Sequence, residues 1–255
     1  MQAPQRLGAI VLAGGRSSRM GAPKALLDWH GGTLMRRVTG ILQRIADPVV
    51  LVHADGQELP ALPGVERVAD RAPDRGPLEG MAAGLRAVAG RCPAVFVSGT
   101  DLPLLHPDLV LALAVARGEH DVAVPVADGH VHHLCAVYGS DLLSAVERQL
   151  AGDRLRVGLL LEAIDVLRLD ASALPHPESL RNLNTDAEYR RALAEPQPQI
   201  TLGAGLAQGS VRAATLGEAT RLAPALSGRR LTLNGAVIEP DPSLPLVEGD
   251  LLQPA

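Results

Sequence analysis

Residues 11–24 read Val-Leu-Ala-Gly-Gly-Arg-Ser-Ser-Arg-Met-Gly-Ala-Pro-Lys, and this segment decides how the rest of the chain is interpreted. The apolar run Leu7–Ala13 leads into it and predicts a strand that is buried on both faces. Glycines have no Cβ, so their backbone N–H groups can approach an anion closely. Arg16, Arg19 and Lys24 add three fixed positive charges at the same place. The segment therefore predicts a polyphosphate site where a strand ends.

The spacing of the glycines separates this loop from two common phosphate-binding motifs. Gly15 and Gly21 are wrongly spaced for a Walker A motif, and Lys24 does not follow a glycine. The pattern also differs from GxGxxG, so a dinucleotide-binding motif is not predicted. A plain turn with solvated arginines is the alternative, although a turn of ~2–6 residues rarely needs three glycines and three cations.

Composition limits the classes of protein to which this chain can belong. With 255 residues, 47% of them apolar, it can bury a sizeable core and is globular rather than disordered. A net charge of −4 and few aromatic residues argue against nucleic-acid binding. The two cysteines have neither metal-site spacing nor a disulfide framework. Because no signal sequence or long apolar run is evident, we expect a cytoplasmic protein that binds neither nucleic acid nor a membrane.

Apolar strand-like runs alternate with helical patterns along most of the chain. This order predicts an α/β fold with a mostly parallel sheet flanked by helices, in the manner of a Rossmann-like fold. The expected strands are Leu7–Ala13, Val49–Val52, Val65–Ala69, Ala94–Val97, Val122–Pro125, Val131–Val137 and Val166–Leu169. The expected helices are Thr33–Ile45, Leu78–Val88, Pro107–Ala116, Ser140–Leu150, Leu155–Ala163 and Thr185–Ala194.

A boundary is predicted at residues 195–199, which read Glu-Pro-Gln-Pro-Gln and show no periodicity. We expect a main domain over residues 1–194, a linker over 195–199 and a small α+β domain over 200–255. The expected order in the small domain is two strands, a helix and three strands. Because so short a segment buries only a modest core, we expect it to lean on the main domain for stability.

Asp101 is the second informative feature. It follows the apolar run Ala94–Val97 and precedes Pro103, at the edge where α/β sheets place their ligands. A turn or helix-cap aspartate is the alternative for this residue taken alone. Combined with the cationic loop, Asp101 predicts a site for metal-assisted phosphate chemistry.

Residues 12–15, 19–21 and 24 read Leu-Ala-Gly-Gly, Arg-Met-Gly and Lys. In this order they resemble the signature of the molybdenum cofactor guanylyltransferases, a MobA-like nucleotidyltransferase family, and the resemblance extends over about residues 6–194. It implies transfer of GMP from GTP to molybdopterin or the molybdenum cofactor, with release of pyrophosphate. Molybdopterin cytidylyltransferases are similar but usually have Ala-Ala-Gly, so the resemblance favours GTP.

The resemblance also implies a set of nucleotide contacts. Asp70, followed by Gly-Pro-Leu-x-Gly at residues 76–80, is similar to a family element that begins a helix, whose free N–H groups can face base or phosphate. Gly80 would let that helix lie flush against a base, and a plain turn is the alternative. The implied nucleotide-binding residues are Leu12, Ala13, Gly14, Gly15, Arg16, Ser17, Gly21, Lys24, His53, Asp70, Gly76, Gly80 and Asp101, with Arg19, Lys24 and Asp101 as catalytic residues.

A metal and an acceptor site follow from the same resemblance. Mg²⁺ is the expected cofactor, held by Asp101 and by Asn184, which belongs to an Asn-x-Asn-Thr match at residues 182–185. Helix capping by Asn184 or Thr185 is the alternative. The expected acceptor-binding residues are His133, Arg154, Arg156 and Asn182, and a solvated helix start is the alternative for the two arginines.

Some positions depart from the family pattern. His53 stands where the family tends to have asparagine, and an imidazole cannot donate and accept from one amide plane, so the choice of base stays open. Leu134 replaces the proline expected after His133. His130 and His132 alternate on the strand expected there, but no second cluster completes a tetrahedral site, so we expect no metal at these histidines.

The C-terminal segment resembles a different class of protein. Residues 231–237 and 246–250 are similar to the ends of small sulfur-carrier β-grasp proteins, which terminate in Gly-Gly, whereas this sequence finishes Gln-Pro-Ala. We therefore expect a β-grasp-like appendage and not a carrier. It would dock a cofactor-biosynthesis or molybdoenzyme-delivery protein, or cover the acceptor pocket.

Two alternatives stay open for the chain as a whole. One is a cytidylyltransferase, or a nucleotidyltransferase for another small acceptor. The other is a non-catalytic nucleotide-binding scaffold, against which the retained Lys24, Asp101 and Asn184 argue, because binding alone could dispense with a metal ligand.

Overall fold

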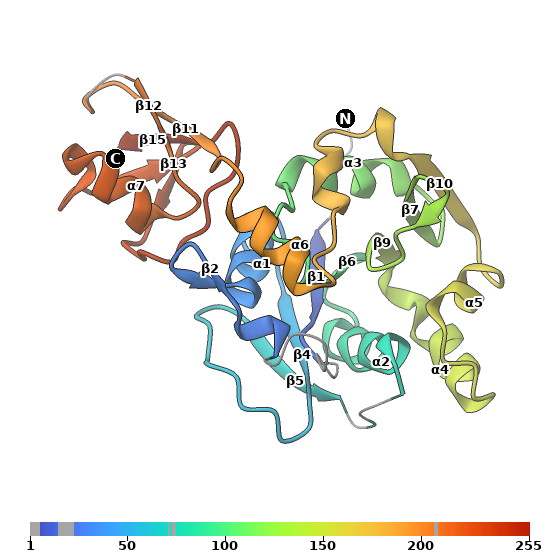
Figure 1. Cartoon of the computed structure of the whole chain (residues 1–255). Helices are drawn as coiled ribbons and strands as arrows, with labels where there is room; N and C mark the ends of the chain where they lie inside the picture. Colours follow the sequence, from blue (N-terminus) through green and yellow to red (C-terminus); the bar gives the residue numbers. More distant parts are fainter. Residues whose placement is uncertain (1–5, 15–22, 71, 73–74, 207–208) are drawn as a thin grey trace.

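The computed structural model describes residues 6–14, 23–70, 72, 75–206 and 209–255. Its large sheet has the strand order β10-β7-β9-β6-β1-β4-β5, with β8 paired to β7 (Figure 1). Strand β9 is antiparallel to both of its neighbours, and the other neighbouring pairs on this path are parallel. The predicted mostly parallel α/β fold is therefore confirmed. The strands are β1 (Leu7–Leu12), β4 (Val49–Ala54), β5 (Glu66–Asp70), β6 (Ala94–Gly99), β7 (Val122–Ala127), β8 (His130–Val131), β9 (Cys135–Gly139) and β10 (Val166–Asp170).

Helices cover both faces of this sheet because its central strands are apolar on both sides. In β1, Ala9 and Val11 belong to a core shared with α1 and α3, whereas Ile10 belongs to a core shared with α2, α4 and α5. Helix α2 lies close to β1, since a Cβ at Gly84 would fall 2.5 Å from Ile10 Cγ2. The helices are α1 (Leu34–Leu42), α2 (Pro77–Val88), α3 (Pro107–Arg117), α4 (Leu143–Ala151), α5 (Val157–Leu161) and α6 (Asp186–Leu193).

The expected single strand Val131–Val137 is wrong, because the chain leaves the sheet between β8 and β9. The N–H of His132 donates to the carbonyl oxygen of Pro125, and a turn then brings the Cys135 N–H onto the His132 carbonyl oxygen. Pro125 has no N–H to offer a continuous ladder, which accounts for the interruption. The expectation that His130 and His132 alternate on one strand fails for the same reason.

A second sheet is formed by the C-terminal segment, with the order β12-β11-β15-β13-β14. Strand β11 pairs antiparallel with β12 and parallel with β15, and it begins at the last residue of the predicted linker. This sheet and α7 (Leu216–Leu222) enclose an apolar core of their own. The strands are β11 (Gln199–Leu202), β12 (Gly209–Arg212), β13 (Leu231–Leu233), β14 (Ala236–Ile238) and β15 (Leu251–Pro254), and a separate two-stranded hairpin joins β2 (Asp28–Trp29) to β3 (Gly32–Thr33).

Arginines of α1 and of the turn after it bind the C-terminal segment, which Figure 1 shows beside α1 and β2. Arg37, which is 5% exposed, donates to the carbonyl oxygen of Pro103 and to those of Ala214 and Leu246. Burial lowers the pKa of Arg37 to about 10. In addition, Arg44 forms a two-armed ion pair with the buried Asp250. The C-terminal segment is therefore hydrogen-bonded to α1 and to the turn after it, in addition to its covalent connection through residues 195–199.

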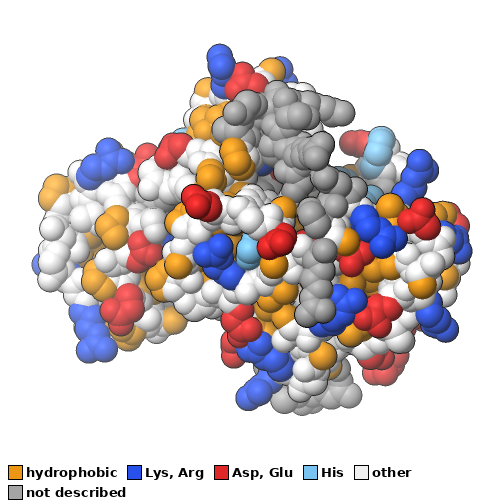
Figure 2. Space-filling model, turned by 90° about the horizontal axis from the view of Figure 1, so that it is seen from below, with side chains coloured by type: hydrophobic (Ala, Val, Ile, Leu, Met, Phe, Trp, Pro, Cys, Tyr) orange, Lys and Arg blue, Asp and Glu red, His pale blue; other side chains and the backbone are white. Residues whose placement is uncertain are grey.

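The surface carries charges of both signs. On the face shown in Figure 2, outside the grey residues, Lys and Arg side chains are interspersed with Asp and Glu and are not gathered into one basic field. Among the helices of the described residues, none has the length and apolar character needed to cross a bilayer.

Candidate active site

Three of the predicted site residues meet at the carboxyl edge of the large sheet. The Nζ atom of Lys24 lies 3.5 Å from Asp101 Oδ2 and donates to Asn184 Oδ1 at 3.3 Å. Lys24 and Asp101 are partly open to solvent, with about a quarter of each side chain exposed. A carboxylate oxygen and an amide oxygen thus converge on one positive charge, although the two residues are far apart in sequence.

The local sequence explains how Asp101 and Asn184 are positioned. Asp101 follows β6, and its carbonyl oxygen accepts from the N–H of Leu183, which ties the two segments together. A Cβ at Gly99 would fall 2.5 Å from Asp101 Oδ1, so a larger residue there would displace the carboxylate. Thr185 caps α6 with its own side chain in a capping box. Capping therefore belongs to Thr185, and the Asn184 side chain contacts Lys24 instead.

Most of the predicted phosphate loop falls outside the described residues. Gly15, Arg16, Ser17, Arg19 and Gly21 are among those that the structure does not describe, so their predicted roles stay predictions.

The beginning of the phosphate loop lies against the end of β4. Gly14 packs beside the backbone of Ala54, where an added Cβ would lie 3.4 Å from the nitrogen. Gln57, which the sequence analysis missed, accepts from the Ala54 N–H and donates to the carbonyl oxygen of Ala13, the residue after Leu12. Its side chain therefore holds the loop against the strand that carries His53.

The predicted base-binding element lies beside these strands. Asp70 ends β5, and its carboxylate accepts from the N–H of Ala72. Gly76 has a φ of +85°, which favours glycine, and it precedes Pro77 at the start of α2. A Cβ at Gly80 would lie 3.1 Å from Leu12 Cδ2, so this glycine serves the packing of α2 on the sheet.

A cavity of about 570 Å³ adjoins Asn184. Its lining includes His133 and Asn182, two of the residues predicted for the acceptor site, and Asn184, which was predicted as a metal ligand. Arg181, which the sequence analysis missed, also lines it. A bidentate ion pair with Glu195 holds the Arg181 guanidinium. The position of Arg181 directly before the Asn-x-Asn-Thr match could have indicated it.

Arg154 and Arg156 are not among the described residues that line this cavity. Their carbonyl oxygens accept from Gln149, and the intervening Leu155 lies beside Gly76 at the start of α2. The turn after α4 leads toward α2, so these two arginines do not contact the cavity. Their predicted role in acceptor binding stays a prediction. None of the described lining residues comes from 200–255.

Burial shifts the pKa values of three groups that line the cavity, His132, His133 and Cys135, toward their neutral forms. Desolvation lowers the pKa of His133 and of His132, for which the neighbouring histidines add a smaller effect in the same direction. It also raises the pKa of the Cys135 thiol well above its usual range, and the nearby Asp101 adds to the effect. Near neutral pH, these histidines carry little positive charge and the thiol is not a nucleophile.

We expect the protein to lose stability as the pH falls from about 7.5 to about 5.5. Because the folded pKa values of His132 and His133 lie below the usual 6.5, the unfolded chain binds more protons in this range. Replacing both histidines by glutamine should flatten the pH dependence of the free energy of unfolding, measured with urea. If the pH dependence of the free energy of unfolding is unchanged in this double variant, the lowered pKa values of His132 and His133 are contradicted.

Comparison with known proteins places these features in a family. Residues 9–165 match the family described as "MobA-like NTP transferase domain". A probable molybdenum cofactor guanylyltransferase from Mycobacterium avium is 37% identical over 194 residues, which cover 74% of this chain and 96% of that protein.

Solved structures show the same fold at lower sequence identity. Molybdopterin-guanine dinucleotide biosynthesis protein A from Archaeoglobus fulgidus superimposes with a TM-score of 0.59 at 22% identity, over 72% of this chain and 96% of that one. A 2-C-methyl-D-erythritol 4-phosphate cytidylyltransferase from Thermus thermophilus gives 0.57 at 19%, over 74% and 98%. The fold by itself therefore does not select the base.

Proposed function

We propose that this chain, which belongs to the MobA-like NTP transferase family, transfers GMP from GTP to molybdopterin or its molybdenum-loaded form. We propose that this reaction takes place in the cytoplasm. The observation that carries the proposal is the meeting of Lys24, Asp101 and Asn184 at the carboxyl edge of the sheet. The relatives named probable molybdenum cofactor guanylyltransferase, at 37% identity, support the choice of acceptor and of base.

The reaction needs no protein nucleophile. An oxygen of the acceptor phosphate attacks the α-phosphorus of GTP, the bond to the bridging oxygen breaks, and pyrophosphate leaves with that electron pair. The chain contributes by positioning the reactants and by neutralising charge. Lys24 would exchange its contact with Asp101 for a phosphate oxygen, which frees the Asp101 carboxylate.

Mg²⁺ fits the residues that are present. Asp101 Oδ2 and Asn184 Oδ1 already face one positive charge, the Lys24 ammonium, and a carboxylate with a neutral oxygen is a donor set that Mg²⁺ accepts. We infer that these two side chains hold the ion, which would neutralise the triphosphate when bound. The cavity beside Asn184 would receive the acceptor, with Arg181 as the guanidinium on its wall.

GTP, in the presence of Mg²⁺, is expected to stabilise the protein more than CTP, ATP or UTP. A ligand that binds only the folded state adds ~2.7 kcal/mol at a concentration of 100 Kd. Thermal shift with each nucleotide separately is the measurement. Stabilisation by CTP without stabilisation by GTP would overturn the guanylyl assignment in favour of the cytidylyl alternative. Nucleotide binding without pyrophosphate release in the presence of molybdopterin would favour the scaffold alternative.

A further inference from the structure

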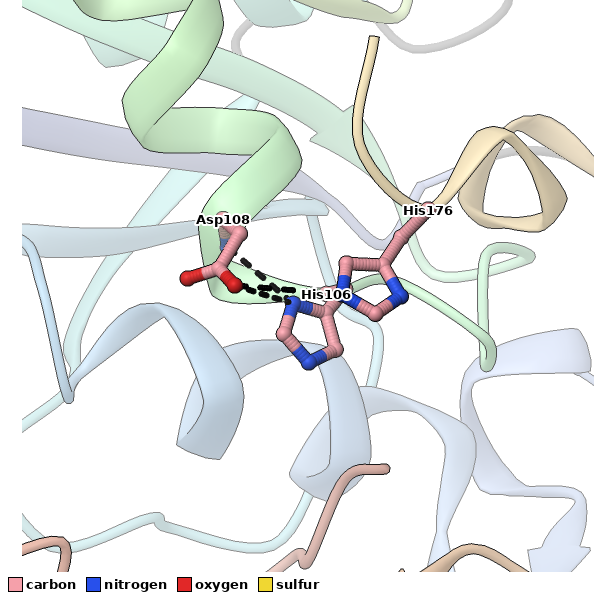
Figure 3. A group of neighbouring side chains, drawn as sticks. All are labelled: His106, Asp108 and His176. Carbon is pink, nitrogen blue, oxygen red and sulfur yellow. Dashed lines mark hydrogen bonds and ion pairs between the residues drawn. The ribbon is translucent and has the colours of Figure 1, made fainter. Parts of the chain in front are cut away.

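A cluster of side chains that can bind a metal lies where α3 begins. The connection from β6 to α3 carries Asp101 near its start and leads to this cluster. His106, Asp108 and His176 point toward one another (Figure 3). Asp108 Oδ2 lies 3.7 Å from His106 Nδ1 and 3.8 Å from His176 Nε2. Ligands about 2.0–2.1 Å from a tetrahedral Zn²⁺ ion are about 3.4 Å apart, so the two distances to Asp108 are only slightly longer than one shared ion requires. All three ligand atoms lie within 4.8 Å of one another.

The remaining ring nitrogens have acceptors that orient both histidines. His106 Nε2 contacts the carbonyl oxygen of Glu248 at 3.1 Å, and His176 Nδ1 contacts Glu178 Oε1 at 3.1 Å. If each of these nitrogens carries the proton, the lone pairs of His106 Nδ1 and His176 Nε2 face Asp108. Metal-binding histidines are commonly oriented by a carbonyl or carboxylate on the other nitrogen, and both kinds occur here.

We propose that His106, Asp108 and His176 bind one divalent transition-metal ion of the zinc class, with water in the fourth position. Two imidazoles and one carboxylate suit such an ion better than Mg²⁺, which prefers oxygen ligands. This site is separate from the Asp101 site, which offers oxygen ligands.

Binding has two structural costs. His106 Nδ1 now accepts from the N–H of Asp108 at 3.2 Å, a helix cap that coordination would replace. The two rings are also stacked, with centroids 3.5 Å apart, and must rotate for their lone pairs to converge. The His176 side chain is 28% exposed and lies in a loop, which leaves it room to turn. The Asp108 carboxylate offsets the repulsion between a cation and the helix N-terminus.

The ion would join three parts of the chain. His106 caps the start of α3, His176 precedes the turn that leads to Asn182 and Asn184, and the Glu248 carbonyl, which His106 contacts, belongs to the C-terminal segment. We therefore expect zinc to stabilise the contact between the main sheet and the C-terminal segment.

Equilibrium dialysis of the full chain against Zn²⁺, followed by elemental analysis, tests the proposal without any measurement of turnover. The wild-type protein should retain one more equivalent than either His176→Gln or Asp108→Asn, and zinc should raise its melting temperature more than theirs. His120→Gln is the matched control, because His120 is an exposed imidazole paired with a carboxylate, Asp165, elsewhere on the surface. It should bind as the wild type does.

Cobalt gives a second measurement on the same proteins, since imidazole-bound tetrahedral Co²⁺ absorbs strongly in the visible range. The wild type and His120→Gln should show this absorption, and the other two variants should lack it. Equal zinc content in the wild type and His176→Gln, or equal losses in His176→Gln and His120→Gln, would overturn the proposal. The assignment of GMP transfer would be unaffected by that outcome.

Discussion

Replacing Asp101 by alanine is expected to lower kcat by at least ~10²–10³-fold, an effect typical of removing one preorganised electrostatic group from an active site. The carboxylate is the strongest ligand that we infer for Mg²⁺, and it also faces Lys24. The free energy of unfolding should change little, because an ion pair that solvent reaches contributes ~0–1 kcal/mol. We therefore expect this variant to lose most of its activity while its stability changes little.

Pyrophosphate release with GTP, Mg²⁺ and molybdopterin measures this effect. Asp101→Asn keeps the shape and removes the charge, so it should approach the alanine variant in activity. Asp165→Asn is the control, because this exposed carboxylate pairs with His120 on the surface, and it should keep wild-type activity. Full turnover by Asp101→Ala would contradict the inference that Asp101 binds Mg²⁺.

Replacing Arg37 by methionine is expected to lower the free energy of unfolding by about 2–4 kcal/mol, the largest stability effect that we predict. The variant keeps an apolar stem of similar length and leaves the carbonyl oxygens of Pro103 and Leu246 without their Arg37 donor, whereas that of Ala214 still accepts from the Leu246 N–H. A buried acceptor without a donor costs about 1–3 kcal/mol. Removing a charge that burial disfavours, as the pKa of about 10 indicates, offsets part of this cost.

Urea unfolding gives both the free energy and its dependence on denaturant. Arg86→Met is the matched control, since Arg86 pairs with Glu147 on the surface and should change stability by less than ~1 kcal/mol. A fall in the slope for Arg37→Met would indicate that the C-terminal segment separates before the main sheet unfolds. A stability loss no larger than that of the control would mean that Arg37 does not anchor that segment.

Much of the fold could be predicted because its signals are local. Apolar runs and helical spacing identified the strands of the large sheet and its helices to within a few residues, and the predicted α/β class is confirmed. Asp101 could be placed at the sheet's edge because a ligand-binding edge follows from the direction of parallel strands. The break between β8 and β9 was missed because it depends on which residues lie opposite Pro125 in the sheet.

The amino-acid sequence by itself determined the fold class, the family and the chemical types of the candidate site residues, because each depends on neighbouring residues or on short motifs. Tertiary structure alone decided that Lys24 meets Asn184 across 160 positions, that Arg37 anchors the C-terminal segment, and that His176 lies beside His106. Such contacts leave no periodic trace in the sequence. They arise where the packing of separate segments brings complementary groups together in space.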